Sequence, residues 1–128
     1  DYVDDVLVYK SNNKGYPGSA GNTTMPTYAQ CGVAPYLNCV GFRWAKSTDR
    51  FVYGGQGSWN SQSINACAPA NSSDPGPDSV GVYMHATHPY LSRLFGATLG
   101  ISNRAIMQFE PLAQKVCNGL GPAKGGHP

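Results

Sequence analysis

PDSVGVYMHATHPYLSRLFGATLGISNRAIMQFEP, residues 77–111, sets the expected fold, because only this segment carries strand, helix and strand signals in uninterrupted succession. In its first part, apolar residues alternate with other residues at a period of two, as in a strand with one apolar face. The apolar positions are Val80, Val82, Met84 and Ala86, and the alternate positions are Gly81, Tyr83, His85 and Thr87. The pattern therefore predicts a strand over residues 80–87.

A short helix is predicted next, over residues 89–95. His88-Pro89 ends the strand because proline has no N–H to give to a ladder, and proline is tolerated at the first position of a helix. Apolar residues at helical spacing follow, namely Tyr90, Leu91, Leu94 and Phe95. Gly96 then suits the position just past a helix end.

A second strand is predicted over residues 98–109, where the period of two returns. One face would carry Leu99, Ile101, Ala105, Met107 and Phe109. Asn103 falls on this apolar face and Ile106 on the polar one, which predicts a bulge near residues 102–104. The short connection favours an antiparallel pairing of the two strands, since a parallel crossover needs a longer connection.

The same segment resembles the C-terminal signature of the TadE-like proteins, which are minor pilin-like subunits of bacterial tight-adherence pili. The residues that carry the resemblance are Pro77, Asp78, Val80, Gly81, Val82, Tyr83, Phe95, Gly96, Glu110 and Pro111. Glu110-Pro111 after an apolar strand is the most telling feature. Gln108 departs from the pattern, because an arginine is common there. Residues 5–10 and the first two cysteines also resemble the start of the extracellular domain in actinobacterial members.

This resemblance implies a non-enzymatic protein without cofactors. Its function would be pilus assembly or adhesion, through contacts with pilin or other pilus-assembly proteins. The domain would lie outside a bacterial cell, anchored by a single N-terminal transmembrane helix that would precede Asp1. Within the 128 residues themselves, no segment is long and apolar enough to span a membrane.

The composition suits a single secreted domain. We place this domain at residues 1–121 and expect a disordered tail at residues 122–128. Charged residues make up only 12% of the chain, whereas it has 16 glycines and 10 prolines, which is typical of a loop-rich β domain. The net charge of +2 is too small to indicate nucleic acid as a partner.

Four cysteines in so short a chain indicate a disulfide framework. Cys31 and Cys39 enclose seven residues that include Gly32 and Pro35, so we expect them to pair with each other. The second predicted pair is Cys67 with Cys117. Sequence alone leaves open the pairing of Cys31 with Cys67 or with Cys117. No C-x-x-C pair points to a zinc site.

The first half of the chain predicts three further strands. Residues 5–10 read as one, with Val6 and Val8 toward the core. Residues 39–44 and 50–54 read as a hairpin, in which Phe42 and Trp44 would meet Phe51 and Tyr53 across the strands. An alternative interpretation is a carbohydrate-binding or adhesive module that uses Trp44, Tyr53 and Trp59.

Several residues of catalytic or metal-binding type are present, but their spacing favours neither role. His85 and His88 lie three apart, so on one strand they point to opposite faces. The cluster of Asp1, Asp4 and Asp5 lacks the glycine turn and further ligands of a calcium loop. There is no Gly-x-Ser-x-Gly elbow, and an even cysteine count argues against a free catalytic thiol.

Together these patterns predict an α+β fold: a small, predominantly antiparallel sheet with one short helix between its last two strands, rich in loops and stapled by disulfides. We expect the strands at residues 5–10, 39–44, 50–54, 80–87 and 98–109.

Overall fold

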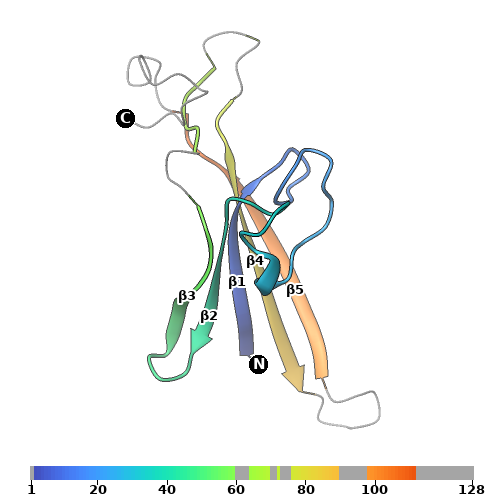
Figure 1. Cartoon of the computed structure of the whole chain (residues 1–128), viewed down its shortest axis with the longest axis vertical. Helices are drawn as coiled ribbons and strands as arrows, with labels where there is room; N and C mark the ends of the chain where they lie inside the picture. Colours follow the sequence, from blue (N-terminus) through green and yellow to red (C-terminus); the bar gives the residue numbers. More distant parts are fainter. Residues whose placement is uncertain (1, 60–63, 70–71, 73–75, 90–97, 112–128) are drawn as a thin grey trace.

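The computed structural model describes residues 2–59, 64–69, 72, 76–89 and 98–111. They form one antiparallel sheet of five strands in the order β3-β2-β1-β4-β5 (Figure 1). The elements are β1 (Tyr2–Ser11), the 3₁₀ helix η1 (Tyr28–Gln30), β2 (Cys39–Ala45), β3 (Arg50–Ser58), β4 (Ser79–Pro89) and β5 (Thr98–Gln108). β1 is the central strand, and β3 and β5 form the two edges.

All five predicted strands are confirmed, as is the antiparallel pairing of β4 with β5. The predicted hairpin of β2 and β3 is also present. Its aromatic pairs form across the strands: the ring centroids of Phe42 and Tyr53 are 6.3 Å apart, and those of Trp44 and Phe51 are 5.1 Å apart. The turn between the strands places Asp49 at a φ of 52°, a left-handed conformation that aspartate tolerates.

The predicted α+β class is wrong. In the described part of the chain, η1 is the only helical element, so the fold is an all-β antiparallel sheet. The predicted helix at residues 89–95 begins at Pro89, which is instead the last residue of β4 and lies opposite Thr98. Residues 90–95 lie outside the described residues.

Proline is compatible with the end of β4 because of its place in the ladder. Phe109 donates its N–H to the carbonyl oxygen of Asp78. In an antiparallel ladder the bonded pairs alternate, so the even-numbered residues of β4 bond to β5 and the odd-numbered ones do not. Pro89 therefore removes no hydrogen bond between β4 and β5.

The predicted faces of the sheet are reversed. We expected Val6 and Val8 in the core, whereas Leu7 and Tyr9 are the β1 residues that are 0% exposed. The register puts further strand residues on the same side as Leu7 and Tyr9, among them Gly41, Gly81 and Tyr83. We call this side the covered face. The predicted apolar faces of β4 and β5 lie on the opposite side, which we call the open face.

The core lies on the covered face because the segment between β1 and β2, residues 12–38, folds over it (Figure 1). From this segment Met25 and Tyr28 pack against the buried cluster of Leu7, Tyr9, Cys31 and Cys39. The predicted Cys31–Cys39 disulfide is present, and it is part of that cluster. Cys67 is also disulfide-bonded, while its predicted partner Cys117 lies outside the described residues.

Two glycines of the covered face make room for aromatic rings. A Cβ atom on Gly81 would lie 2.2 Å from Cζ of Tyr9, and one on Gly41 would lie 2.7 Å from Cε2 of Tyr28. The hydroxyl of Tyr9 donates to the carbonyl oxygen of Gly15 at 3.0 Å. Gly81 of β4 thus accommodates a ring from β1, and Gly41 of β2 accommodates a ring from η1.

The predicted bulge in β5 is absent, since the ladder with β4 is continuous from Thr98 to Gln108. The register shifts in the described sheet lie elsewhere, between Val3 and Asp5 in β1 and between Gly41 and Phe42 in β2. Within the described ranges, no helix has the length and apolar character needed to cross a membrane.

Candidate functional site

The register shift at the start of β1 gathers ionisable side chains on the covered face. Val3 lies opposite Ala86, and Asp5 lies opposite His85, so Asp4 is the extra residue of a bulge. Because a bulge interrupts the alternation of side chains, both Asp4 and Asp5 reach toward the same histidine. Nδ1 of His85 is 3.5 Å from Oδ2 of Asp4 and 3.8 Å from Oδ2 of Asp5.

A hydrogen bond from β4 and partial burial also define the surroundings of these side chains. The Thr87 hydroxyl donates a hydrogen bond to Oδ2 of Asp4. The imidazole remains partly open to solvent, with a side-chain exposure of 41%, whereas that of Asp5 is 17%. Asp5 is therefore the member of the group that is most removed from water.

Burial raises the pKa of the Asp5 carboxyl above its ordinary value, because a charged carboxylate loses hydration there. Positive charge on His85 opposes this rise, Asp4 reinforces it, and Arg43 opposes it. Desolvation is the largest of these effects. The site thus holds a carboxyl that binds a proton more readily than a free aspartic acid does.

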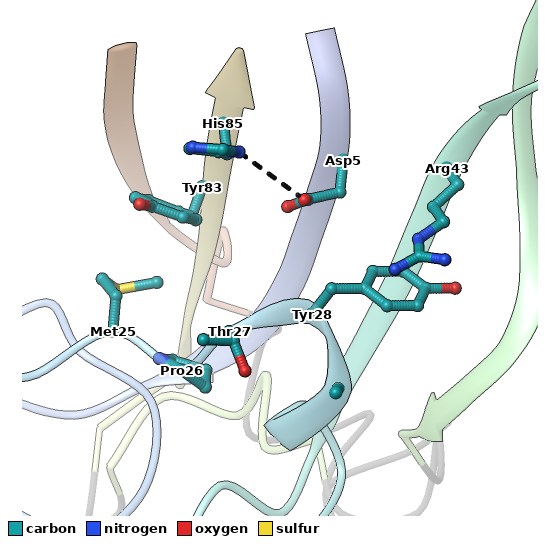
Figure 2. A pocket seen from close by; sticks show the side chains of 9 residues that line it. Asp5, Met25, Pro26, Thr27, Tyr28, Arg43, Tyr83 and His85 are labelled. Atoms are coloured by element: carbon teal, nitrogen blue, oxygen red, sulfur yellow. Dashed lines mark ion pairs between the residues drawn. The ribbon is translucent and has the colours of Figure 1, made fainter. Parts of the chain in front are cut away.

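A cavity of about 450 Å³ opens beside Asp5 and His85 (Figure 2). Its apolar side comes from the segment over the covered face, with Met25, Pro26 and Tyr28. The guanidinium of Arg43 lies over the Tyr28 ring, with its Cζ 4.0 Å from the ring centroid. The complete lining is Asp5, Met25, Pro26, Thr27, Tyr28, Ala29, Arg43, Tyr83 and His85.

This arrangement can bind a ligand that has both polar and apolar parts. An imidazole beside two carboxylates offers hydrogen-bonding groups, and a guanidinium on an aromatic ring offers a flat cationic surface. A polar group attached to an apolar body, such as a side chain of another protein, matches the mixed character of the cavity.

Metal binding has no support in the described residues, where no group of three or more His, Cys, Asp or Glu side chains could hold an ion. His85 and His88 both lie in β4, three positions apart, so they are on opposite faces of the sheet as the sequence argument predicts. The acidic partners of His85 were not predicted from the sequence. Asp4 and Asp5 lie some eighty residues away along the chain, and only the pairing of β1 with β4 brings them close.

Among the residues of the TadE-like motif, Asp78 links several parts of the fold. Its Oδ2 is 2.7 Å from Nζ of Lys10 and accepts the backbone N–H of Asn65 at 2.7 Å. Its carbonyl oxygen accepts the N–H of Phe109, while its own N–H donates to Asn65. Asp78 therefore ties β1, the start of β4, the end of β5 and the buried Asn65 together, which is a structural role.

The other motif residues are spread over the sheet. Val80 and Val82 lie on the open face, Gly81 accommodates the Tyr9 ring, and Tyr83 lines the cavity. Pro77 accepts a hydrogen bond from the Gln108 side chain, and the exposed Glu110 and Pro111 follow β5. Phe95 and Gly96 lie outside the described residues. The motif thus marks the β4–β5 pair and does not form one site.

Comparisons with protein-family models, with curated proteins and with solved structures found no match. The resemblance to the TadE-like proteins therefore stays a prediction from the sequence.

Proposed function

We propose that this domain is a non-enzymatic, extracellular pilin-like subunit of a bacterial tight-adherence pilus, which acts in assembly or adhesion through contacts with pilin or other pilus-assembly proteins. The resemblance of residues 77–111 to the TadE-like signature supplies the type of partner. The structural feature that supports protein contacts is the open face of the sheet.

The open face is an apolar surface that runs across all five strands. No described helix or strand packs across it. Tyr53, Met84, Ile101 and Met107 are 55%, 44%, 51% and 69% exposed. The register adds these residues to the same face: Val6, Val8, Val40, Phe42, Trp44, Phe51, Val80, Val82, Ala86, Leu99 and Ala105.

Such a surface is a binding surface on physical grounds. Large contiguous apolar patches are rare on soluble proteins that act alone, and they mark contacts with other proteins. Burying apolar area against a partner contributes roughly 25 cal/mol per Å² to association. Loss of freedom and polar desolvation offset part of this gain. A sheet face of mixed aliphatic and aromatic residues therefore fits the apolar side of a partner helix or strand.

The test is binding of the purified domain to purified pilin subunits of the same bacterium, measured by biolayer interferometry. We expect Met84→Glu and Ile101→Glu to weaken binding by about tenfold or more, because each places a charge inside the contact. Leu37→Glu is the matched control, since Leu37 is 58% exposed and lies in the segment over the covered face.

Absence of binding to pilin subunits would overturn the proposal. Equal weakening by Leu37→Glu and by Met84→Glu would show that the open face is not the contact surface. Circular dichroism of each variant establishes that the sheet is intact.

Carbohydrate binding is the second candidate, because the paired rings of Phe42, Trp44, Phe51 and Tyr53 share the open face. Nε1 of Trp59 is buried and has no hydrogen-bond partner among the described residues, so this indole N–H is not presented to solvent. A glycan array with the wild-type domain and with Tyr53→Ala tests this role. Binding that the substitution abolishes would favour it over pilin contacts.

A further inference from the structure

β5 is an edge strand whose free side is built for pairing. Because Phe109 bonds to Asp78, the odd-numbered residues of β5 direct their N–H and C=O groups to β4. The even-numbered residues direct theirs away from the sheet. These are Thr98, Gly100, Ser102, Arg104, Ile106 and Gln108.

Among the residues that the structure describes, this free side lacks the usual protection of sheet edges. Natural edges are blocked by prolines, bulges, several charges or a covering segment. β5 has no proline, no register shift and a single charged residue, Arg104, and all eleven of its residues are exposed. The N–H of Arg104 is bonded to Oδ1 of Asn103 at 2.8 Å, and it is the only outward N–H of β5 with a partner among the described residues.

The sequence of β5 is complementary to itself when two copies run antiparallel about a two-fold axis at Asn103. Residue numbers of opposing partners then add up to 206, so Leu99 faces Met107 and Ile101 faces Ala105 of the second copy. All four lie on the open face, which would continue into the second sheet on either side of the central Asn103 pair. In this register, the residues whose N–H and C=O groups point away from β4 lie opposite one another in the two copies. They can therefore form the hydrogen bonds of an antiparallel ladder.

On the covered face, large side chains of one β5 strand lie opposite small residues of the other in the same register. Ile106, whose side chain lies where a Cβ on Gly15 would meet it, would face Gly100, and Arg104 would face Ser102. Within one chain Gly100 has no steric need to be glycine, because a Cβ there would make only an ordinary contact of 3.7 Å with His85. The guanidinium of Arg104 is held over its own Tyr16 ring, with Cζ 3.6 Å from the centroid, so it does not face its symmetry mate directly.

We infer that two copies of this chain associate through antiparallel pairing of their β5 strands, centred on Asn103, to form a continuous ten-stranded sheet. The interface is isologous, so it closes as a dimer and leaves no β5 edge free. When the pair forms, the Arg104 N–H exchanges its bond to Oδ1 of Asn103 for a bond to the second copy. This inference rests on the β5 edge and not on the proposed pilus function.

Cysteine cross-linking tests the register. Opposing residues of a non-hydrogen-bonded antiparallel pair have Cα atoms about 4.5 Å apart, which suits a disulfide. We expect Asn103→Cys to form covalent dimers at least about tenfold faster than Leu99→Cys, because two copies of position 99 would be roughly 26 Å apart. A mixture of Leu99→Cys and Met107→Cys should form mixed dimers, whereas neither variant should dimerise alone.

Sedimentation velocity on the unsubstituted chain tests association itself. Ser102→Pro removes an outward N–H without loss of a bond to β4 and should give a monomer, whereas Ser102→Thr keeps the N–H and should remain a dimer. A wild-type chain that stays monomeric up to about 1 mM would overturn the inference. Equal cross-linking rates for Asn103→Cys and Leu99→Cys, or no mixed dimer of Leu99→Cys with Met107→Cys, would also overturn it.

Discussion

Asp5 shows how one bulge changes the chemistry of a residue. A regular strand would direct Asp4 and Asp5 to opposite faces, but the extra residue in β1 sends both toward His85 on the covered face. The Asp5 carboxyl consequently loses hydration, and its pKa rises. Acidic side chains are usually solvated, so this rise in pKa could not be expected from the sequence.

Replacement of the Asp5 carboxyl by an amide should stabilise the fold at neutral pH. The raised pKa means that the folded state binds the Asp5 proton more tightly than the unfolded state does, so ionisation of Asp5 destabilises the fold. We expect Asp5→Asn to raise the free energy of unfolding at pH 7 by at most about 1 kcal/mol, since the side chain keeps some contact with water. Urea denaturation measures this.

The raised pKa of Asp5 also predicts how the stabilisation by Asp5→Asn depends on pH. As the pH falls toward and below 3.8, the ordinary value for aspartic acid, the wild-type carboxyl becomes neutral and the advantage of Asp5→Asn should vanish. Asp49→Asn in the exposed β2–β3 turn controls for the change in net charge. A gain from Asp5→Asn that persists at pH 3 would contradict the assignment to ionisation.

At the scale of elements, the packing of β1 against β4 depends on a ring lying over a glycine. Tyr9 and Gly81 face each other in the register, and the phenol ring is fully buried above the glycine. Burial also raises the pKa of the Tyr9 hydroxyl, and the nearby charge of Arg104 partly opposes this rise. The periodicity of β4 treats Gly81 as a residue of the polar face, although it is part of the core.

Gly81→Ala should be strongly destabilising, because the new Cβ would lie 2.2 Å from the Tyr9 ring. Overpacking of this kind costs about 1–3 kcal/mol. Thermal and urea denaturation would report the loss. Gly76→Ala is the control, since no atom lies within 4 Å of a Cβ there, and its stability should match that of the wild type. A Gly81→Ala variant as stable as Gly76→Ala would disprove the packing argument.

At the scale of the whole molecule, the sheet is asymmetric. One face is covered by residues 12–38 and holds the core with its disulfide, whereas the other face is apolar and has no described element across it. Within the described sheet, β1 has a neighbouring strand on both sides, and β5 has one on a single side. Stability against local opening should therefore decrease from the centre of the sheet to its edges.

Amide hydrogen exchange measures this gradient. At concentrations that keep the chain monomeric, we expect the amides of Leu7 and Tyr9 to exchange most slowly. Within β5, the N–H groups of Ile101 and Ala105 should exchange at least about tenfold more slowly than those of Ser102 and Ile106, which face away from β4. Uniform exchange along monomeric β5 would contradict the ladder assignment, whereas protection of Ser102 and Ile106 at high concentration would report β5 pairing.

The elements of the fold were predictable because their signals are local. Alternation of apolar residues and turn formers located all five strands, and the hairpin placed Phe42 opposite Tyr53. The helix expected from residue 89 was wrong at its start, because Pro89 fits a strand position where the β5 ladder uses no N–H. Local sequence signals do not show which residues of a strand direct their N–H groups toward a given neighbouring strand.

The sequence by itself determined the strands, their antiparallel hairpins and the Cys31–Cys39 bridge, since each depends on residues that are close in the chain. The tertiary structure alone decided which face became the core. Both faces of β1 and β4 carry apolar residues, so periodicity could not choose between Val6 with Val8 and Leu7 with Tyr9. The choice was made by the disulfide-linked segment, which packs Tyr28 over Gly41 and encloses Tyr9 over Gly81. The same long-range pairing brought Asp4 and Asp5 to His85.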